Sequence, residues 1–223
     1  ALQLAMDVVE GKAAGYITPP EVLGVMPAVH GLDDEVPSHI GFIVESSGST
    51  GEPKRIALSV DALLASANAS AARIGSGQWL LALPTNFIAG INVLVRSVVA
   101  DTQPVLLNTQ VPFTAEAFVR GAALMSEDRY TSLVPHQLSK LLASAREDAF
   151  VFSELRKFNT ILVGGQQPNW ADVLELRTMG VNVVVSYGMT ETSGGCVYDG
   201  VPLDGVQLEI VDDRIAISGP VLA

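Results

Sequence analysis

Residues 46–54 read Ser-Ser-Gly-Ser-Thr-Gly-Glu-Pro-Lys and combine the groups that bind phosphate. Glycine backbones can adopt positive φ and approach an anion closely, so that successive N–H groups point at it. The hydroxyl groups can donate further hydrogen bonds, and Lys54 adds a positive charge. The segment follows the apolar run 40–44, which predicts a strand that leads directly into a phosphate-binding loop.

The spacing of this loop excludes a P-loop NTPase, in which four residues separate the first glycine from a Gly-Lys-Ser/Thr triplet. Here two residues separate Gly48 from Gly51, and Pro53 precedes the lysine. A Rossmann dehydrogenase is disfavoured as well, because no Gly-x-Gly-x-x-Gly turn opens a helix. For this loop taken alone, a Gly/Ser-rich connector without a ligand is the alternative.

The elements that must position these residues alternate along the chain. Continuous apolar strands between helices favour an α/β fold with mostly parallel sheets covered by helices on both faces. Two alternating runs at 206–210 and 214–217 predict a small antiparallel β segment at the C-terminal end. The expected strands are 79–83, 104–107, 130–134, 160–163 and 181–186, and the expected helices are 62–74, 90–100, 115–125, 137–145 and 170–179.

Composition limits the class of protein. A net charge of −11 with 13 Lys and Arg argues against a nucleic-acid partner, because phosphate backbones require clustered positive charge. No apolar run reaches the roughly 20 residues of a membrane span, and residues 1–5 lack the basic flank of a signal peptide. A single cysteine, Cys196, excludes an internal disulfide framework. We therefore expect a cytoplasmic protein with no membrane span, and a homo-oligomer stays open.

Three expected strand-end segments share one rim of the sheet: residues 46–54, Gly164-Gly165-Gln166-Gln167, and Tyr187-Gly188-Met189-Thr190-Glu191-Thr192. Their order and spacing resemble the adenylate-forming (AMP-binding) superfamily of acyl-CoA synthetases, aryl-acid ligases and peptide-synthetase adenylation domains. A closer resemblance is to the short actinobacterial-type o-succinylbenzoate:CoA ligases of menaquinone biosynthesis. It rests on residues 187–200, 202–206, 83–84, 88–90 and 93–97.

The resemblance implies a two-step reaction that uses ATP, Mg²⁺ and coenzyme A. A small-molecule acid attacks the α-phosphate of ATP, which gives acyl-adenylate and pyrophosphate, and coenzyme A then displaces AMP. Lys54, Thr190 and Glu191 are the implied catalytic residues, with Glu191 as the metal ligand. A carboxylate that only stabilises a helix N-terminus is the alternative for Glu191. The implied nucleotide-binding residues are Ser46, Ser47, Gly48, Ser49, Thr50, Gly51, Lys54, Gly164, Gly165, Gln166, Tyr187, Gly188 and Thr190.

Arg96 is the most informative residue of the expected acid pocket. On a helix, Asn92 and Arg96 share a face within an apolar stretch. We expect Arg96 to approach a substrate carboxylate, because o-succinylbenzoate carries two and only one is activated; a surface or structural salt bridge is the alternative. His136 follows a strand end, although a structural role is the simpler reading. The substrate-binding residues expected are Asn86, Phe87, Gly90, Arg96, Ser186, Gly188, Met189 and Gly194.

The chain departs from the family at three points. Phe87 stands where many acyl-CoA synthetases have histidine, and Arg55 replaces the usual glycine after Pro-Lys. The family's C-terminal lid domain with its catalytic lysine has no match, so we expect one N-terminal domain over 1–223, incomplete at both ends, that binds nucleotide but turns over poorly alone. The alternatives are another aryl- or fatty-acid AMP-forming ligase, or a catalytically incompetent nucleotide-binding module.

Overall fold

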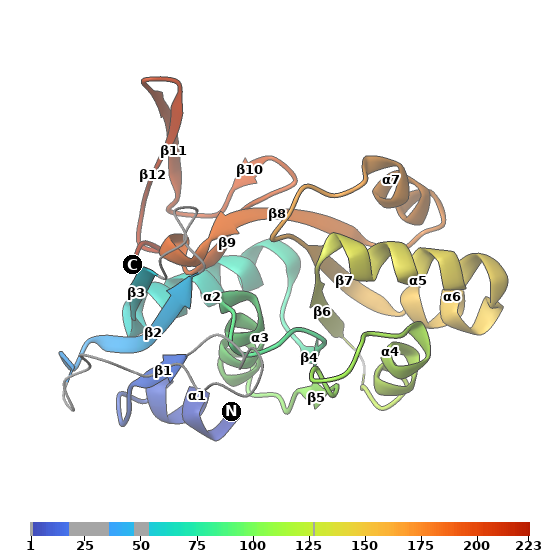
Figure 1. Ribbon diagram of the computed structural model, residues 1–223, viewed down its shortest axis with the longest axis horizontal. Helices are drawn as coiled ribbons and strands as arrows, with labels where there is room; N and C mark the ends of the chain where they lie inside the picture. Colours follow the sequence, from blue (N-terminus) through green and yellow to red (C-terminus); the bar gives the residue numbers. More distant parts are fainter. Residues whose placement is uncertain (1, 18–35, 47–53, 127) are drawn as a thin grey trace.

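The computed structural model describes residues 2–17, 36–46, 54–126 and 128–223 (Figure 1). Within these ranges the main sheet has seven strands in the order β10-β9-β8-β7-β6-β4-β5. The strands β8, β7, β6, β4 and β5 are parallel, whereas β9 and β10 form an antiparallel edge. Their bounds are β4 Gln78–Leu81, β5 Val105–Leu106, β6 Arg129–Leu133, β7 Phe158–Val163, β8 Val183–Met189, β9 Gly194–Tyr198 and β10 Val201–Pro202.

Helices cover both faces of this sheet, as the alternation of strands and helices predicts. In β4, Leu80 packs into one apolar cluster, while its neighbours Trp79 and Leu81 pack into another on the opposite face. Side chains alternate between faces along a strand, so each face receives its own helices. The first cluster holds α4 (Ala115–Ala122), α5 (Pro135–Glu147), α6 (Ala149–Leu155) and α7 (Trp170–Thr178); the second holds α2 (Val60–Ile74) and α3 (Ile88–Val99).

A smaller sheet carries the base of the predicted phosphate loop. It contains β1 (Gly15–Ile17), β2 (Ile40–Ser46) and β3 (Lys54–Ser59), next to helix α1 (Leu2–Val9). The predicted strand 40–44 is confirmed, but Lys54 is the first residue of β3 rather than the end of a loop. It pairs with Ser46 across an antiparallel ladder. Residues 47–53, and with them Ser47, Gly48, Ser49, Thr50 and Gly51, lie outside the described residues.

The remaining differences from the sequence prediction come from long-range pairing. Tyr187, Gly188 and Met189 were expected in a loop, yet they belong to β8, because β9 pairs with them on the side away from β7. Helices α1 and α6 and strands β1, β3, β9 and β10 were not predicted. The predicted C-terminal hairpin is confirmed as β11 (Gln207–Val211) and β12 (Arg214–Ser218), and it projects from the body in Figure 1.

The strand order places a crevice between β4 and β6. From β4 the chain passes to β5 on one side, and it then returns to β6 on the other side of β4. In parallel sheets ligands bind at the carboxyl ends of the strands where the order reverses. None of the helices in the described part of the chain combines the length and the apolar character needed to cross a bilayer.

Candidate functional site

An open cleft of about 790 Å³ lies at the carboxyl ends of β4, β6, β7 and β8. We call it the outer cleft. Segments that are far apart in the sequence form its walls, which include the loop after β4, the start of α3, the end of β8 and the first residue of β3. The predicted site residues that line it are Lys54, Phe87, Gly165, Gln166, Gly188, Met189, Thr190 and Glu191.

A second space of about 110 Å³, the inner cavity, adjoins the outer cleft and extends toward α3. The two spaces share wall residues at the start of α3 and at the end of β8. Asn92 and Arg96 from α3 and Ser132 from β6 line the inner cavity but not the outer cleft. The predicted residues Gly164, Ser186 and Gly194 line it as well. A nucleotide-sized cleft therefore opens into a smaller cavity with a buried cation.

The catalytic residues implied by the sequence meet in the outer cleft. Thr190 and Glu191 belong to a short 3-10 helix, η1 (Thr190–Thr192), which packs against β3 and so lies near Lys54. The hydroxyl of Thr192 accepts a hydrogen bond from the Met189 N–H at 3.0 Å and folds this turn back onto the strand end. The turn presents a hydroxyl and an exposed carboxylate to the outer cleft, and Lys54 of β3 adds an ammonium group to the same cleft.

Glu191 fits a metal that arrives with a nucleotide better than a resident metal ion. The described residues contain no group of three His, Cys, Asp or Glu side chains arranged to hold a metal. Mg²⁺ is commonly held by one or two carboxylates together with substrate phosphates and water, and one exposed carboxylate in an open cleft matches that donor set. The alternative role for Glu191, stabilisation of a helix N-terminus, is weak here because η1 has only three residues.

Next to the predicted phosphate-binding loop, a cluster of Tyr16, Glu45 and Arg55 links strands β1, β2 and β3. Glu45 accepts a hydrogen bond from the Tyr16 hydroxyl and another from Arg55 Nε at 3.2 Å. The Arg55 guanidinium also lies over the Tyr16 ring, 5.8 Å from its centroid. Burial and the neighbouring Glu45 carboxylate raise the pKa of Tyr16. Arg55, which replaces the family's usual glycine, thus contacts Glu45 of β2 and Tyr16 of β1.

Gln137 joins the two strand ends that flank the crevice, and the sequence reasoning missed it. Its Nε2 donates to the carbonyl of Ala82 after β4 at 2.9 Å, and its Oε1 accepts from the N–H of Val134 after β6 at 3.1 Å. The side chain is buried and lines the outer cleft. A polar residue in the first turn of a helix that begins at Pro135 is the sequence signal that marks it.

Arg96 is buried with its charge beside the inner cavity. Its side chain is 7% exposed, and its guanidinium lies 5.0 Å from the centre of the Trp79 ring system. Its Nη2 donates to the Tyr198 hydroxyl at 3.1 Å, and its Nη1 lies 3.4 Å from Ser132 Oγ. In the part of the chain that the structure describes, Nε has no partner and no carboxylate pairs with Arg96. A surface or structural salt bridge is therefore not its role among these residues.

Close backbone contact fixes the wall between β8, β9 and α3. Asn92 Nδ2 donates to the carbonyl of Ser193 at 2.8 Å, in the turn that follows η1. Gly194 has φ of +93°, and a Cβ there would lie 2.2 Å from Asn92 Nδ2. A Cβ at Gly188 would lie 2.0 Å from the carbonyl oxygen of Gly194. These two positions require glycine, and the carbonyl of Ser193 supports the wall of the inner cavity by accepting from Asn92.

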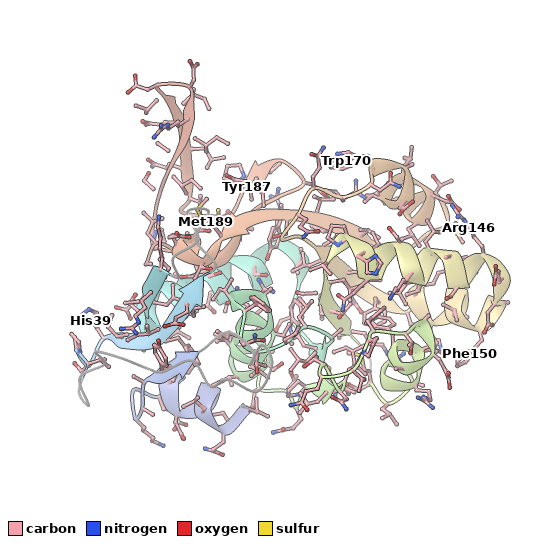
Figure 2. All side chains as sticks on the ribbon, in the orientation of Figure 1. His39, Arg146, Phe150, Trp170, Tyr187 and Met189 are labelled. Carbon is pink, nitrogen blue, oxygen red and sulfur yellow. The ribbon has the colours of Figure 1, made fainter. Side chains whose placement is uncertain are left out.

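Three expected site residues, Asn86, Gly90 and Tyr187, line neither space, and neither does His136. A Cβ at Gly90 would lie 2.2 Å from the carbonyl oxygen of Pro84, so Gly90 serves the packing of α3 against the loop before it. The Asn86 side-chain nitrogen is buried away from both spaces, and His136 is exposed outside them. Tyr187 is 45% exposed, because it alternates with Ser186 and Gly188, which line the inner cavity. Figure 2 shows Tyr187 and Met189 along the same edge of the molecule.

Comparison with curated proteins finds relatives that share much of this sequence. The chain is 43% identical over 205 residues to a probable 2-succinylbenzoate–CoA ligase of Mycobacterium tuberculosis, which covers 91% of this chain and 51% of the relative. It is 31% identical over 185 residues to the 2-succinylbenzoate–CoA ligase of Bacillus pumilus, covering 76% of this chain and 36% of the relative. The chain thus spans about half the length, or less, of these curated relatives.

Solved structures match the fold. The o-succinylbenzoate CoA synthetase of Bacillus subtilis in complex with its acyl-adenylate intermediate superposes with a TM-score of 0.70 at 25% identity, over 82% of this chain and 41% of that chain. The same enzyme with ATP and magnesium gives 0.68 at 26% identity, over 82% and 42%. The sequence model of the family described as AMP-binding enzyme matches residues 13–218. This chain belongs to that family of AMP-binding enzymes.

Proposed function

We propose that this chain forms the nucleotide- and acid-binding domain of an ATP-dependent, AMP-forming o-succinylbenzoate:CoA ligase of menaquinone biosynthesis. The observation that carries the proposal is the buried guanidinium of Arg96, which has no carboxylate partner among the described residues and lines a small cavity beside the outer cleft. An acid with two carboxylates can place one at Arg96 and the other in the cleft. The names of the curated relatives support the same substrate.

The outer cleft supplies groups suited to adenylation. When the carboxylate attacks the α-phosphate, negative charge grows on the phosphate oxygens, and preorganised donors stabilise it. In our proposal Thr190 donates to the α-phosphate, while Lys54 and the hairpin loop hold the β- and γ-phosphates. Glu191 would hold Mg²⁺, which supplies Lewis-acid stabilisation of the phosphate charge when bound. All three side chains line the outer cleft.

The remaining contacts concern the adenine ring and the acid. We propose that Gly164, Gly165 and Gln166 lie along the adenine, with Tyr187 covering its face by stacking. For the acid, Phe87 forms a wall of the outer cleft in place of the histidine common in relatives. Ser186, Gly188, Met189 and Gly194 line the inner cavity that would hold the aromatic ring.

Thermal unfolding with a ligand panel tests the proposal. The panel contains MgATP, AMP and non-hydrolysable acyl-adenylate mimics that carry o-succinylbenzoyl, salicyl or decanoyl groups. A ligand at about 100 times its Kd adds about 2.7 kcal/mol to the free energy of unfolding. We expect the largest shift with the o-succinylbenzoyl mimic. A larger shift with another acyl group would point to a different aryl- or fatty-acid ligase, and no shift with any nucleotide would point to a module without the site.

The cellular setting is part of the proposal. The proposed substrates of the protein are small molecules, namely the acid, ATP and coenzyme A. We propose that the protein works in the cytoplasm. The sequence leaves a homo-oligomer open, and analytical ultracentrifugation of the purified chain measures whether one forms.

A further inference from the structure

We propose that Tyr198, held in turn by Ser70, fixes the orientation of the Arg96 guanidinium and thereby sets the preference for an acid with a second carboxylate. The inference rests on the proposed function, because it requires Arg96 to bind that carboxylate. Tyr198 and Ser70 do not line the inner cavity. They are positioning residues that act through Arg96.

Two consecutive hydrogen bonds link Arg96 to Tyr198 and Tyr198 to Ser70. Arg96 Nη2 donates to the Tyr198 hydroxyl at 3.1 Å, and that hydroxyl lies 2.9 Å from Ser70 Oγ. A guanidinium has no acceptor, so the phenol oxygen must accept from Arg96. The phenol oxygen and Ser70 Oγ share the second bond, in which either hydroxyl can be the donor. All three side chains are at most 7% exposed, and they come from α3, β9 and α2.

The Trp79 ring and the small size of a neighbouring void further restrict the guanidinium. Its carbon lies 5.0 Å from the centre of the Trp79 ring system, which limits the tilt of the guanidinium plane. The space next to it, lined by Ser70 and Trp79, has a volume of about 10 Å³, which is too small for the guanidinium to move into. The Arg96 side chain therefore separates this small void from the inner cavity, which it also lines.

Nε and Nη1 of Arg96 are the donors that remain for a ligand. Nε has no partner within the described residues, and the 3.4 Å contact between Nη1 and Ser132 Oγ is at the long limit of a hydrogen bond. Because Tyr198 occupies Nη2, a planar carboxylate meets a guanidinium whose rotation is already fixed. Preorganisation of this kind increases affinity by lowering the ordering cost of binding.

Isothermal titration with two acyl-adenylate mimics tests the inference. One carries the o-succinylbenzoyl group, and the other lacks only the ring carboxylate. In Tyr198→Phe we expect affinity for the first mimic to fall about 10-fold, the effect of about 1.4 kcal/mol, and affinity for the second to change less than about 2-fold. Ser70→Ala should show the same selectivity with a smaller loss. Arg96→Lys retains the positive charge, but it should not retain the preference for the mimic with the ring carboxylate.

Tyr130→Phe is the matched control. Tyr130 is also buried and packs on Trp79, with ring centroids 5.4 Å apart, but its hydroxyl does not contact Arg96. It should leave the ratio of the two affinities unchanged. Equal losses for both mimics, or no loss, in Tyr198→Phe and Ser70→Ala would overturn the inference while the proposed function stands. A wild-type chain that binds both mimics equally would overturn the carboxylate assignment of Arg96 and this inference with it.

Discussion

Replacing Arg96 by methionine should stabilise the ligand-free protein while it removes recognition of the acid. The side chain is 7% exposed and carries a positive charge that no carboxylate balances among the described residues. The desolvation penalty for a buried ion is several kcal/mol. Such an arrangement is expected where a site is built for a ligand that supplies the missing charge.

The magnitude follows from the contacts. The interaction with Trp79 returns up to about 2 kcal/mol, and the charged hydrogen bond to Tyr198 returns about 1.5–3 kcal/mol. The 3.4 Å contact to Ser132 adds little. These gains offset most of the desolvation cost but leave Nε unpaired. Methionine keeps the apolar packing and leaves the Tyr198 hydroxyl bonded to Ser70, so we expect a net gain of about 1–2 kcal/mol.

For a chain of 223 residues this gain corresponds to a rise in Tm of about 2–8 °C. Urea and thermal unfolding of the ligand-free wild type and Arg96→Met measure it. The same variant should lose the extra stabilisation by the o-succinylbenzoyl mimic. A fall in the free energy of unfolding by more than about 1 kcal/mol would refute the reasoning, because it would make Arg96 a structural residue.

Arg129→Met is the matched control, and it should change the free energy of unfolding in the opposite direction. Arg129 Nη1 lies 3.2 Å from Glu154 Oε2, and the Glu154 side chain is 3% exposed. Removing the arginine leaves a buried carboxylate with Lys157 as its remaining ion-pair partner among the described residues. We expect a loss of about 3 kcal/mol. The same substitution therefore destabilises where the charge is paired and stabilises where it is not.

Three further predictions concern the rest of the site. Glu191→Gln should weaken binding of MgATP about 10-fold and leave AMP binding unchanged in titrations with and without Mg²⁺. Asn92→Ala removes the 2.8 Å bond to the Ser193 carbonyl and should lower the free energy of unfolding in urea by about 1–2 kcal/mol. Burial raises the pKa of the Cys196 thiol, so the folded chain retains that proton more tightly than the unfolded chain. Stability should therefore fall as the pH rises above about 8.5, and less steeply in Cys196→Ala.

The sequence by itself determined the class of fold and pointed to residues that the structure brings into one cleft. Apolar runs that alternate with amphipathic stretches report local periodicity, which is why the parallel strands, the helices on both faces and the hairpin around residues 207–218 were predictable. The motifs that carry the family resemblance contain Lys54, Thr190 and Glu191, and these three residues line the outer cleft. Such signals are local, because each depends on a few neighbouring residues.

Only the tertiary structure decided the surroundings of each group. Tyr187 belongs to a strand because β9 pairs with it, and Lys54 begins a strand because it pairs with Ser46; neither pairing is encoded in the neighbouring residues. The same holds for Arg96, whose neighbours Trp79 and Tyr198 come from β4 and β9. Burial and long-range pairing depend on how distant segments pack. The sequence therefore shows that an arginine is present, and the fold determines that its charge is buried, oriented by Tyr198 and without a carboxylate partner among the described residues.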